Sequence, residues 1–297
     1  MTTLSPTQDS LRAGLFMVAA AASFVTNDTF VKLLDGSVPV GEIIAVRGTF
    51  SAILLAAACS QRKLFFATPL VFARSVLARS AFDLVATVLF IVALIHMPIA
   101  NLTSIIQTVP LAVIVMAFLF LGERVGWRRI LAVIAGFIGV LLIARPAPQT
   151  FSIYEMLALG IVLLAAVRDI MTRRIPAKVP SLIVAFANAL FVTAGGFVLG
   201  VIQGFIGLEL WQLGCLTAAS LFLGLGYVFM VMTLRLGEIA VSAPFRYVNV
   251  LFSIFSGVVV FGEIPDLWAL AGMALIVASG LYTIHRERMI RRRRAAC

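Results

Sequence analysis

Charged residues are scarce in this chain of 297 residues. Only 12% are charged, 62% are hydrophobic, and the mean hydropathy is +1.11. Because a soluble domain carries about 25% charged residues, the polar surface here is too small to cover a water-soluble globule. The net charge of +10 comes from basic residues in short segments between apolar runs and in the RRRR run near the end. That distribution is typical of membrane topology signals and argues against nucleic-acid binding.

Cysteine and histidine are also scarce, with three and two residues. The cysteines are too few and too scattered for a disulfide framework or a metal cluster. His96 and His285 lie far apart, and no HExxH, G-x-S-x-G or Walker A pattern occurs. We therefore expect no enzyme, no cofactor, no metal and no direct use of ATP. The first ten residues, MTTLSPTQDS, lack the basic region of a cleavable signal peptide.

Long apolar runs, by contrast, are abundant. A bilayer core needs about 20 apolar residues per helix. Windows of this kind predict an all-α integral membrane protein with ten transmembrane helices, at residues 12–34, 40–60, 75–95, 98–121, 127–145, 153–172, 181–203, 210–234, 239–261 and 266–285. The connections between them are too short for an extramembrane domain.

The basic residues predict the orientation. With the N-terminus in the cytoplasm, 18 Lys and Arg residues flank the spans on the inside, and only Lys32 and Arg145 do so on the outside. Since cytoplasmic loops carry the excess of Lys and Arg, we expect both termini to be cytoplasmic. The terminal RRRR run either anchors this topology or binds anionic lipid or a partner.

The sequence repeats itself at an offset of about 141 residues. NDTFVK at 27–32 aligns with RDIMTR at 168–173, and FLGE at 120–123 aligns with VFGE at 260–263 after a slip of one residue. This predicts a first five-helix repeat at residues 1–146 and a second at 147–297. Because five is odd, the second repeat enters the membrane inverted, which is typical of secondary transporters.

These features together resemble a known family. Ten spans in two repeats, the polar end of the first span and the GE that closes spans four and nine resemble the EamA type of the drug/metabolite transporter superfamily. The most specific stretch is FLGERVGWRRILAVIAGFIGVLLI, whereas the second repeat has FGEIPD without the basic residues. The chain is similar to bacterial YddG-type amino-acid exporters. The resemblance implies a central cavity lined by spans one to four and six to nine, in the bacterial inner membrane.

Ionisable side chains near the outer ends of the first two spans are candidate gating residues. Within a span such a side chain costs about 2.5–3.5 kcal/mol or more and usually faces a partner inside the bundle. Asp28 and Lys32 are four residues apart on one helix face, and the second span brings Glu42 and Arg47 to the same level. They form either an ion-pair latch across the outer mouth or a static pair that fixes helix packing.

A second charged group lies toward the predicted inner mouth. Arg168, Asp169 and Arg173 end the sixth span, and Asp83 lies about a third of the way into the third span. Asp83 has two possible partners, Arg79 one turn earlier or Arg168 on the other helix. The second pairing predicts an inner gate.

Polar side chains near the middle of the membrane are the candidate substrate site. They are Gln107, Thr108, Tyr227, Arg246, Tyr247 and Asn249. Spans four and nine occupy equivalent places in the two repeats, and each is interrupted by a proline, Pro110 or Pro244. Interrupted helices of this kind mark substrate sites in transporters, although proline and glycine also serve packing alone. Asn188 is expected to hydrogen-bond between helices.

The predicted function is export of small metabolites, amino acids above all, by alternating access. Amides, hydroxyls, one arginine and aromatics suit a small zwitterion, and no unpaired midplane carboxylate is offered to a lipophilic cation. The alternatives are a multidrug exporter and an uptake carrier of the same fold. The expected partners are a small-molecule substrate and membrane lipid, with the chain a monomer or a weak homodimer.

Overall fold

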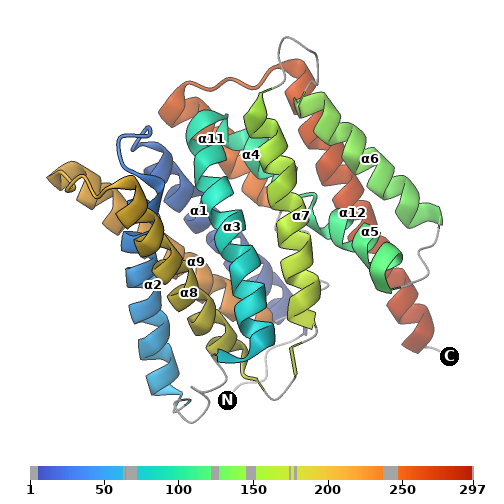
Figure 1. The fold of residues 1–297 in the computed structure, drawn as a ribbon. Helices are drawn as coiled ribbons and strands as arrows, with labels where there is room; N and C mark the ends of the chain where they lie inside the picture. Colours follow the sequence, from blue (N-terminus) through green and yellow to red (C-terminus); the bar gives the residue numbers. More distant parts are fainter. Residues whose placement is uncertain are drawn as a thin grey trace. The chain divides into compact units, whose positions relative to one another are not determined.

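The fold is known from a computed structural model that describes residues 6–62, 64, 72–121, 127–144, 152–173, 175–176, 179–236 and 247–295. Within these ranges all regular structure is helical, with no strand (Figure 1). The helices are α1 (Pro6–Lys32), α2 (Val40–Gln61), α3 (Arg74–His96), α4 (Ile99–Ile106), α5 (Val109–Leu121), α6 (Trp127–Ala144), α7 (Ile153–Arg173), α8 (Ser181–Gln203), α9 (Leu210–Leu236), α11 (Val248–Phe261) and α12 (Leu267–Ala295).

The all-helical prediction is confirmed, and each predicted span contains a helix. Six of these regions are long and apolar enough to cross a membrane, namely Ala13–Lys32, Val40–Gln61, Arg74–His96, Ile99–Leu119, Leu182–Gln203 and Leu210–Met230. Ile130–Ile143, Val248–Phe261 and Leu267–Tyr282 are shorter apolar helices. The count of ten crossings and the orientation of the termini stay predictions. The last helix differs from expectation, because α12 continues through the arginine-rich segment to Ala295.

The fourth predicted span is two helices and not one. α4 ends at Ile106, residues 107–108 form a turn, and α5 begins at Val109. Pro110 explains the break, because it has no N–H to donate and its ring clashes with the preceding turn of a continuous helix. At the second position of α5 the missing N–H has no cost. The side chain of Thr108 closes α4 instead, with Oγ1 donating to the carbonyl of Ile105 at 2.6 Å.

Three helices begin directly after a proline. Pro39, Pro98 and Pro180 are the N-cap residues of α2, α4 and α8, and none of them makes a side-chain capping bond. Proline lacks the side-chain oxygen with which Ser, Thr, Asp or Asn accepts an N–H at this position. Side chains distant in sequence cap two of these helices. Gln203 Oε1 accepts from the N–H of Gly41 at 2.8 Å, and Glu263 Oε2 accepts from the N–H of Ile99 at 3.0 Å.

The chain forms two compact units, each assembled from three stretches. Unit 1 comprises residues 1–26, 98–152 and 225–297, and unit 2 comprises residues 27–97 and 153–224. The boundaries fall inside α1, between Thr26 and Asn27, and inside α9, between Gly224 and Leu225. Each unit therefore takes segments from both predicted repeats, whose own boundaries stay a prediction.

In unit 2, α2 packs along α8 in antiparallel orientation. At one end, a Cβ added to Gly41 would lie 2.6 Å from the Cα of Gly200, so the two backbones touch. At the other end, Cys59 Sγ lies 4.0 Å from the carbonyl oxygen of Leu182. Small residues allow such close approach where the surrounding lipid is as apolar as the side chains.

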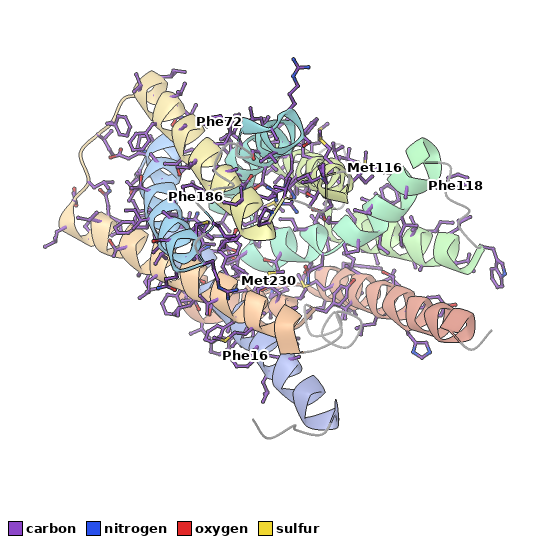
Figure 2. The ribbon with its side chains drawn as sticks, turned by 90° about the horizontal axis from the view of Figure 1, so that it is seen from below. Phe16, Phe72, Met116, Phe118, Phe186 and Met230 are labelled. Carbon is purple, nitrogen blue, oxygen red and sulfur yellow. The ribbon has the colours of Figure 1, made fainter. Side chains whose placement is uncertain are left out.

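In unit 1, α6 packs along α12 in the same manner (Figure 1). A Cβ at Gly139 would lie 2.8 Å from the carbonyl oxygen of Gly272, and one at Gly136 would lie 3.0 Å from Ser279 Oγ. The outer surface of α6 is apolar, with Phe137 and Leu131 more than half exposed. Phe118 of the neighbouring α5, labelled in Figure 2, is also more than half exposed. Such a surface suits contact with lipid.

Candidate functional site

The structure divides the predicted site residues between the two units. The described members of the predicted substrate site, Gln107, Thr108, Tyr227, Tyr247 and Asn249, all belong to unit 1. The described members of the predicted gates, Asp28, Lys32, Arg47, Asp83, Arg168 and Asp169, all belong to unit 2. Arg246 and the side chain of Arg173 lie outside the described part of the chain.

The break between α4 and α5 places hydrogen-bonding groups inside unit 1. Gln107 is 9% exposed and Thr108 is 7% exposed. The preceding turn adds Ser104, which is fully buried and whose Oγ has no hydrogen-bond partner. α4 packs against α11. The end of α4 and the break after it therefore bring three buried polar side chains together along the chain, Ser104, Gln107 and Thr108. Sequence reasoning did not single out Ser104.

Tyr247 and Asn249 lie at the start of α11. Tyr247 is 7% exposed, and its hydroxyl points to α12, where a Cβ at Gly280 would collide with it. The side-chain Oδ1 of Asn249 is buried without a hydrogen-bond partner. In this conformation Tyr247 is packed between helices, so contact with a substrate would require Tyr247 to move.

Of the predicted substrate residues that the structure describes, Tyr227 of α9 is the most exposed, at 48%. Its ring meets that of Phe24 edge-on, with centroids 5.6 Å apart. Gly226 makes room for this contact, because a Cβ there would lie 2.7 Å from the ring of Phe24. Gly226 thus allows α9 and α1 to approach closely at this point.

The first charged cluster of unit 2 consists of Asn27, Asp28, Lys32 and Arg47, and we call it cluster A. Asn27 Nδ2 donates to Asp28 Oδ1 at 2.8 Å, and Arg47 attracts the same carboxylate electrostatically. Lys32 is only 8% exposed, and its ammonium donates to the carbonyl oxygen of Met97 at 2.6 Å. The contact described for Lys32 thus ties the end of α1 to the end of α3.

Glu42 was expected to join this group as part of an outer latch. It is buried at the start of α2, and its Oε2 accepts from the backbone N–H of Ile206 at 3.3 Å. The bond described for Glu42 is therefore to the backbone of the segment after α8 and not to a basic side chain. A carboxylate in the first helical turn is also stabilised by the helix dipole.

The second charged cluster consists of Asp83, Arg168, Asp169 and Asn188, and we call it cluster B. Arg168 forms ion pairs with Asp83 at 2.7 Å and with Asp169 at 2.9 Å. Asn188 Nδ2 donates to the other oxygen of Asp83 at 2.6 Å. Of the two partners left open for Asp83, the structure has Arg168, and Asn188 bonds between helices as expected. Cluster B thus joins α3, α7 and α8.

Arg79, the local alternative for Asp83, has a different contact. Its Nε donates to Thr172 Oγ1 on α7 at 3.0 Å. Among the residues described, no group of three or more His, Cys, Asp or Glu side chains is arranged to hold a metal ion.

Glu263 is a structural residue whose contact the sequence did not reveal. α11 ends at Gly262 in the left-handed conformation (φ 67°), and the N–H of Glu263 donates to the carbonyl of Gly257 at 2.9 Å. This turn directs the carboxylate of Glu263 to the N-terminus of α4. The signal was the GE dipeptide, which is recognisable as a motif but does not name its partner.

Apolar helices, a proline-interrupted span and ion pairs between helices are typical of a membrane transporter. The chain belongs to the EamA-like transporter family, whose model matches residues 11–145 and again residues 152–284. This confirms the resemblance to EamA-type drug/metabolite transporters, whose members are not enzymes. The finer resemblance to YddG-type amino-acid exporters is not shown.

The chain is similar to several characterised transporters. It is 24% identical over 273 residues to the pseudopaline exporter CntI of Pseudomonas aeruginosa, covering 91% of this chain and 95% of the exporter. It is 27% identical over 206 residues to a riboflavin transporter of Brucella anthropi, covering 67% and 72% of the two chains. It is 25% identical over 192 residues to an S-adenosylmethionine uptake transporter of Rickettsia bellii, covering 64% and 65%.

A solved crystal structure shares the fold. It aligns with a TM-score of 0.66 at 18% sequence identity and covers 91% of this chain and 96% of the other.

Proposed function

We propose that the chain is a secondary transporter that exports small metabolites, amino acids above all, by alternating access. The observation that carries this proposal is the buried polar break at Gln107 and Thr108. In a lipid-embedded bundle, irregular backbone is tolerated only where it is buried in protein or lines a cavity, and interrupted helices hold the substrate in many transporters. Residues 99–121 and 247–261 contain no acidic residue. Uncharged donors and acceptors fit a zwitterion better than a lipophilic cation.

The two clusters of unit 2 act as gates in this proposal. Cluster A, with Asp28, Lys32 and Arg47, closes the outer mouth. Cluster B, with Arg173 as a further member, closes the inner mouth. Ion pairs suit this task, because their partners can separate and be hydrated when a mouth opens. The competing role is static packing.

In this proposal, two inverted repeats, residues 1–146 and 147–297, exchange conformations, so that the transporter opens alternately to the two sides of the membrane. The two separate family matches support this division. The α2–α8 packing supports it further, because the offset of 141 residues maps Gly41 onto Leu182 and Cys59 onto Gly200. The two contacts at the ends of this helix pair are therefore repeat counterparts. We propose ten crossings in a bacterial inner membrane, with both termini cytoplasmic and the chain a monomer or weak homodimer.

The relatives leave the substrate and the direction open. One is named as an exporter and another as an uptake transporter, and their named substrates differ. Export of amino acids rests on the uncharged site and on the family resemblance. A lipophilic-cation exporter and a metabolite uptake carrier of the same fold are the alternatives.

Transport into inside-out membrane vesicles tests the proposal. We expect saturable uptake of labelled amino acids, with counterflow that identifies a carrier and not a channel. Gln107→Leu and Thr108→Val should each lower transport at least about tenfold, because a lost hydrogen bond to a charged group costs roughly 1.5–3 kcal/mol. Thr26→Val, which removes only a bond within α1 to the carbonyl of Ala22, is the matched control. If ethidium competes and amino acids do not, the multidrug alternative is correct.

A further inference from the structure

Cluster A contains a buried hydrogen-bond acceptor with no partner. Asn27 is 2% exposed, and while its Nδ2 donates to Asp28, its Oδ1 has no hydrogen-bond partner. An acceptor left in this state is destabilising, because burial has removed its water partner and no protein donor replaces it. The amide orientation is fixed by the bond to Asp28, since a flipped amide would place two acceptors against each other. A buried Oδ1 of this kind is ready to accept from a ligand.

Cluster B is the repeat counterpart of cluster A, with two side chains exchanged. The offset of 141 residues places Asn27 on Arg168, Asp28 on Asp169 and Arg47 on Asn188. In the first repeat the guanidinium is on the second helix, as Arg47, and the amide is on the first helix, as Asn27. In the second repeat the order is reversed, with Arg168 on the first helix and Asn188 on the second. Both clusters keep one aspartate at the same point.

The charge balance differs between the two clusters. In cluster B, Arg168 bonds two carboxylates, Asp83 and Asp169. The residue equivalent to Asp83 in the other repeat is Gly224. Cluster A accordingly has two basic side chains, Lys32 and Arg47, for the one carboxylate of Asp28. The amide oxygen of Asn188 also lacks a partner, but Asn188 is only partly buried.

We propose that cluster A is a binding site for a substrate carboxylate with an adjacent hydrogen-bond donor, the simplest case being the carboxylate and ammonium of an amino acid. Arg47 and Lys32 receive the carboxylate, for which a guanidinium offers a planar two-point match. Asn27 Oδ1 and Asp28 receive the ammonium. The substrate carboxylate competes with Asp28 for Arg47, so binding loosens the proposed outer latch. This inference rests on the proposed function and deepens it.

Ligand-induced shifts of the thermal unfolding midpoint of the full-length protein in detergent measure the affinity. The probes are L-phenylalanine, phenethylamine and 3-phenylpropionate, together with L-leucine, isoamylamine and 4-methylpentanoate. In each set of three, the amino acid carries both charged groups, the amine carries only the ammonium, and the acid carries only the carboxylate. Arg47→Lys should lower the affinity for the carboxylate-bearing probes at least about tenfold and leave the affinity for the amines within about twofold of the wild type. Arg62→Lys, at the exposed C-terminal end of the same helix, is the control.

Asn27→Leu separates a binding role from a structural one. The change removes both the buried unpartnered oxygen and the hydrogen bond that Nδ2 donates to Asp28, two effects of opposite sign, so the unfolding temperature should stay close to that of the wild type. Its affinity for the ammonium-bearing probes should fall at least about fivefold. Thr26→Val is the neighbouring control. A purely structural role predicts the opposite pattern, with lower stability and unchanged affinity, and would overturn the inference.

The remaining outcomes separate a failure of the proposed binding site from a failure of the proposed function. If the wild type binds no carboxylate-bearing probe, or if both variants bind every probe normally, the inference is wrong. If the vesicles transport L-phenylalanine or L-leucine while the variants bind normally, the proposed function stands without this site. If 3-phenylpropionate or 4-methylpentanoate binds through Arg47 and no amino acid is transported, the site stands and the amino-acid substrate is wrong.

Discussion

At the level of single residues, Glu263 gives the GE motif of the second repeat a physical role. Its carboxylate accepts from the N–H of Ile99, the first residue of α4. Pro98 precedes this residue and has no side chain that can cap the helix. A Cβ at Gly257 would lie 3.3 Å from Glu263 Oε2, so a larger residue there would crowd this carboxylate. The motif thus links the end of α11 to the start of α4.

Replacement of Glu263 should therefore destabilise the protein. We expect Glu263→Ala to lower the free energy of unfolding by about 1–2 kcal/mol, since the N–H of Ile99 loses its acceptor. Glu263→Gln keeps a carbonyl oxygen that can accept this hydrogen bond, so its free energy of unfolding should fall by less. The measurement is the unfolding midpoint in detergent. Glu209→Gln is the control, because Glu209 accepts from Trp211 at an exposed position. Equal effects of the two Gln variants would contradict a capping role for Glu263.

Arg246 is a residue for which the sequence alone makes a prediction, since it lies outside the described residues. In a substrate role its guanidinium binds a carboxylate at two points, whereas in a structural role it pairs permanently with Asp83 or Asp169. Both of these carboxylates already bond Arg168. Arg246→Lys should weaken the apparent transport affinity at least about tenfold without a change in unfolding temperature. Rescue of Arg246→Ala by Asp169→Asn would instead establish the structural role.

At the level of helices, the close packing of α2 and α8 depends on glycine. A Cβ at Gly196 would lie 2.7 Å from the backbone nitrogen of Ala45, which no side-chain movement relieves. Gly196→Ala should therefore destabilise the protein by about 1–3 kcal/mol through forced separation of the helices. Gly214→Ala is the control in α9, because nothing lies within 4 Å of its added Cβ. There, alanine should stabilise by about 0.5–1 kcal/mol. The measurement is again thermal unfolding, and similar shifts for the two variants would contradict the close contact.

The sequence predicted helices better than contacts between them. Apolar runs determine where helices form in lipid, and Pro110 marks the interruption of the fourth span in the sequence itself. For Asp83 the sequence offered Arg79 at helical spacing and Arg168 on another span, and spacing alone does not measure distances between helices. Glu263 and Ile99 are 164 residues apart. Such a contact follows only from the packing of distant segments, so no local pattern could predict it.

At the level of the whole molecule, the two groups of predicted site residues fall in different units of the fold. The described members of the predicted gates belong to unit 2, and the described members of the predicted substrate site belong to unit 1. α1 and α9 each contribute to both units, so their backbones connect the two groups of residues directly. We expect such continuous helices to link the two groups in the proposed alternating-access cycle.

The orientation of the chain is the last prediction, and the native cysteines allow a direct test. In the variant Cys59→Ala, Cys215→Ala, the remaining cysteine is Cys297. If the terminus is cytoplasmic, a membrane-impermeant maleimide labels it only after the cells are permeabilised. Adding Ser37→Cys, in the exposed turn after α1, and replacing Cys297 by Ala should give labelling in intact cells. Nine predicted crossings separate the two positions, and because nine is odd they must lie on opposite sides. Labelling of both positions from the same side would contradict ten crossings, and a reversed pattern would place the 18 basic residues outside.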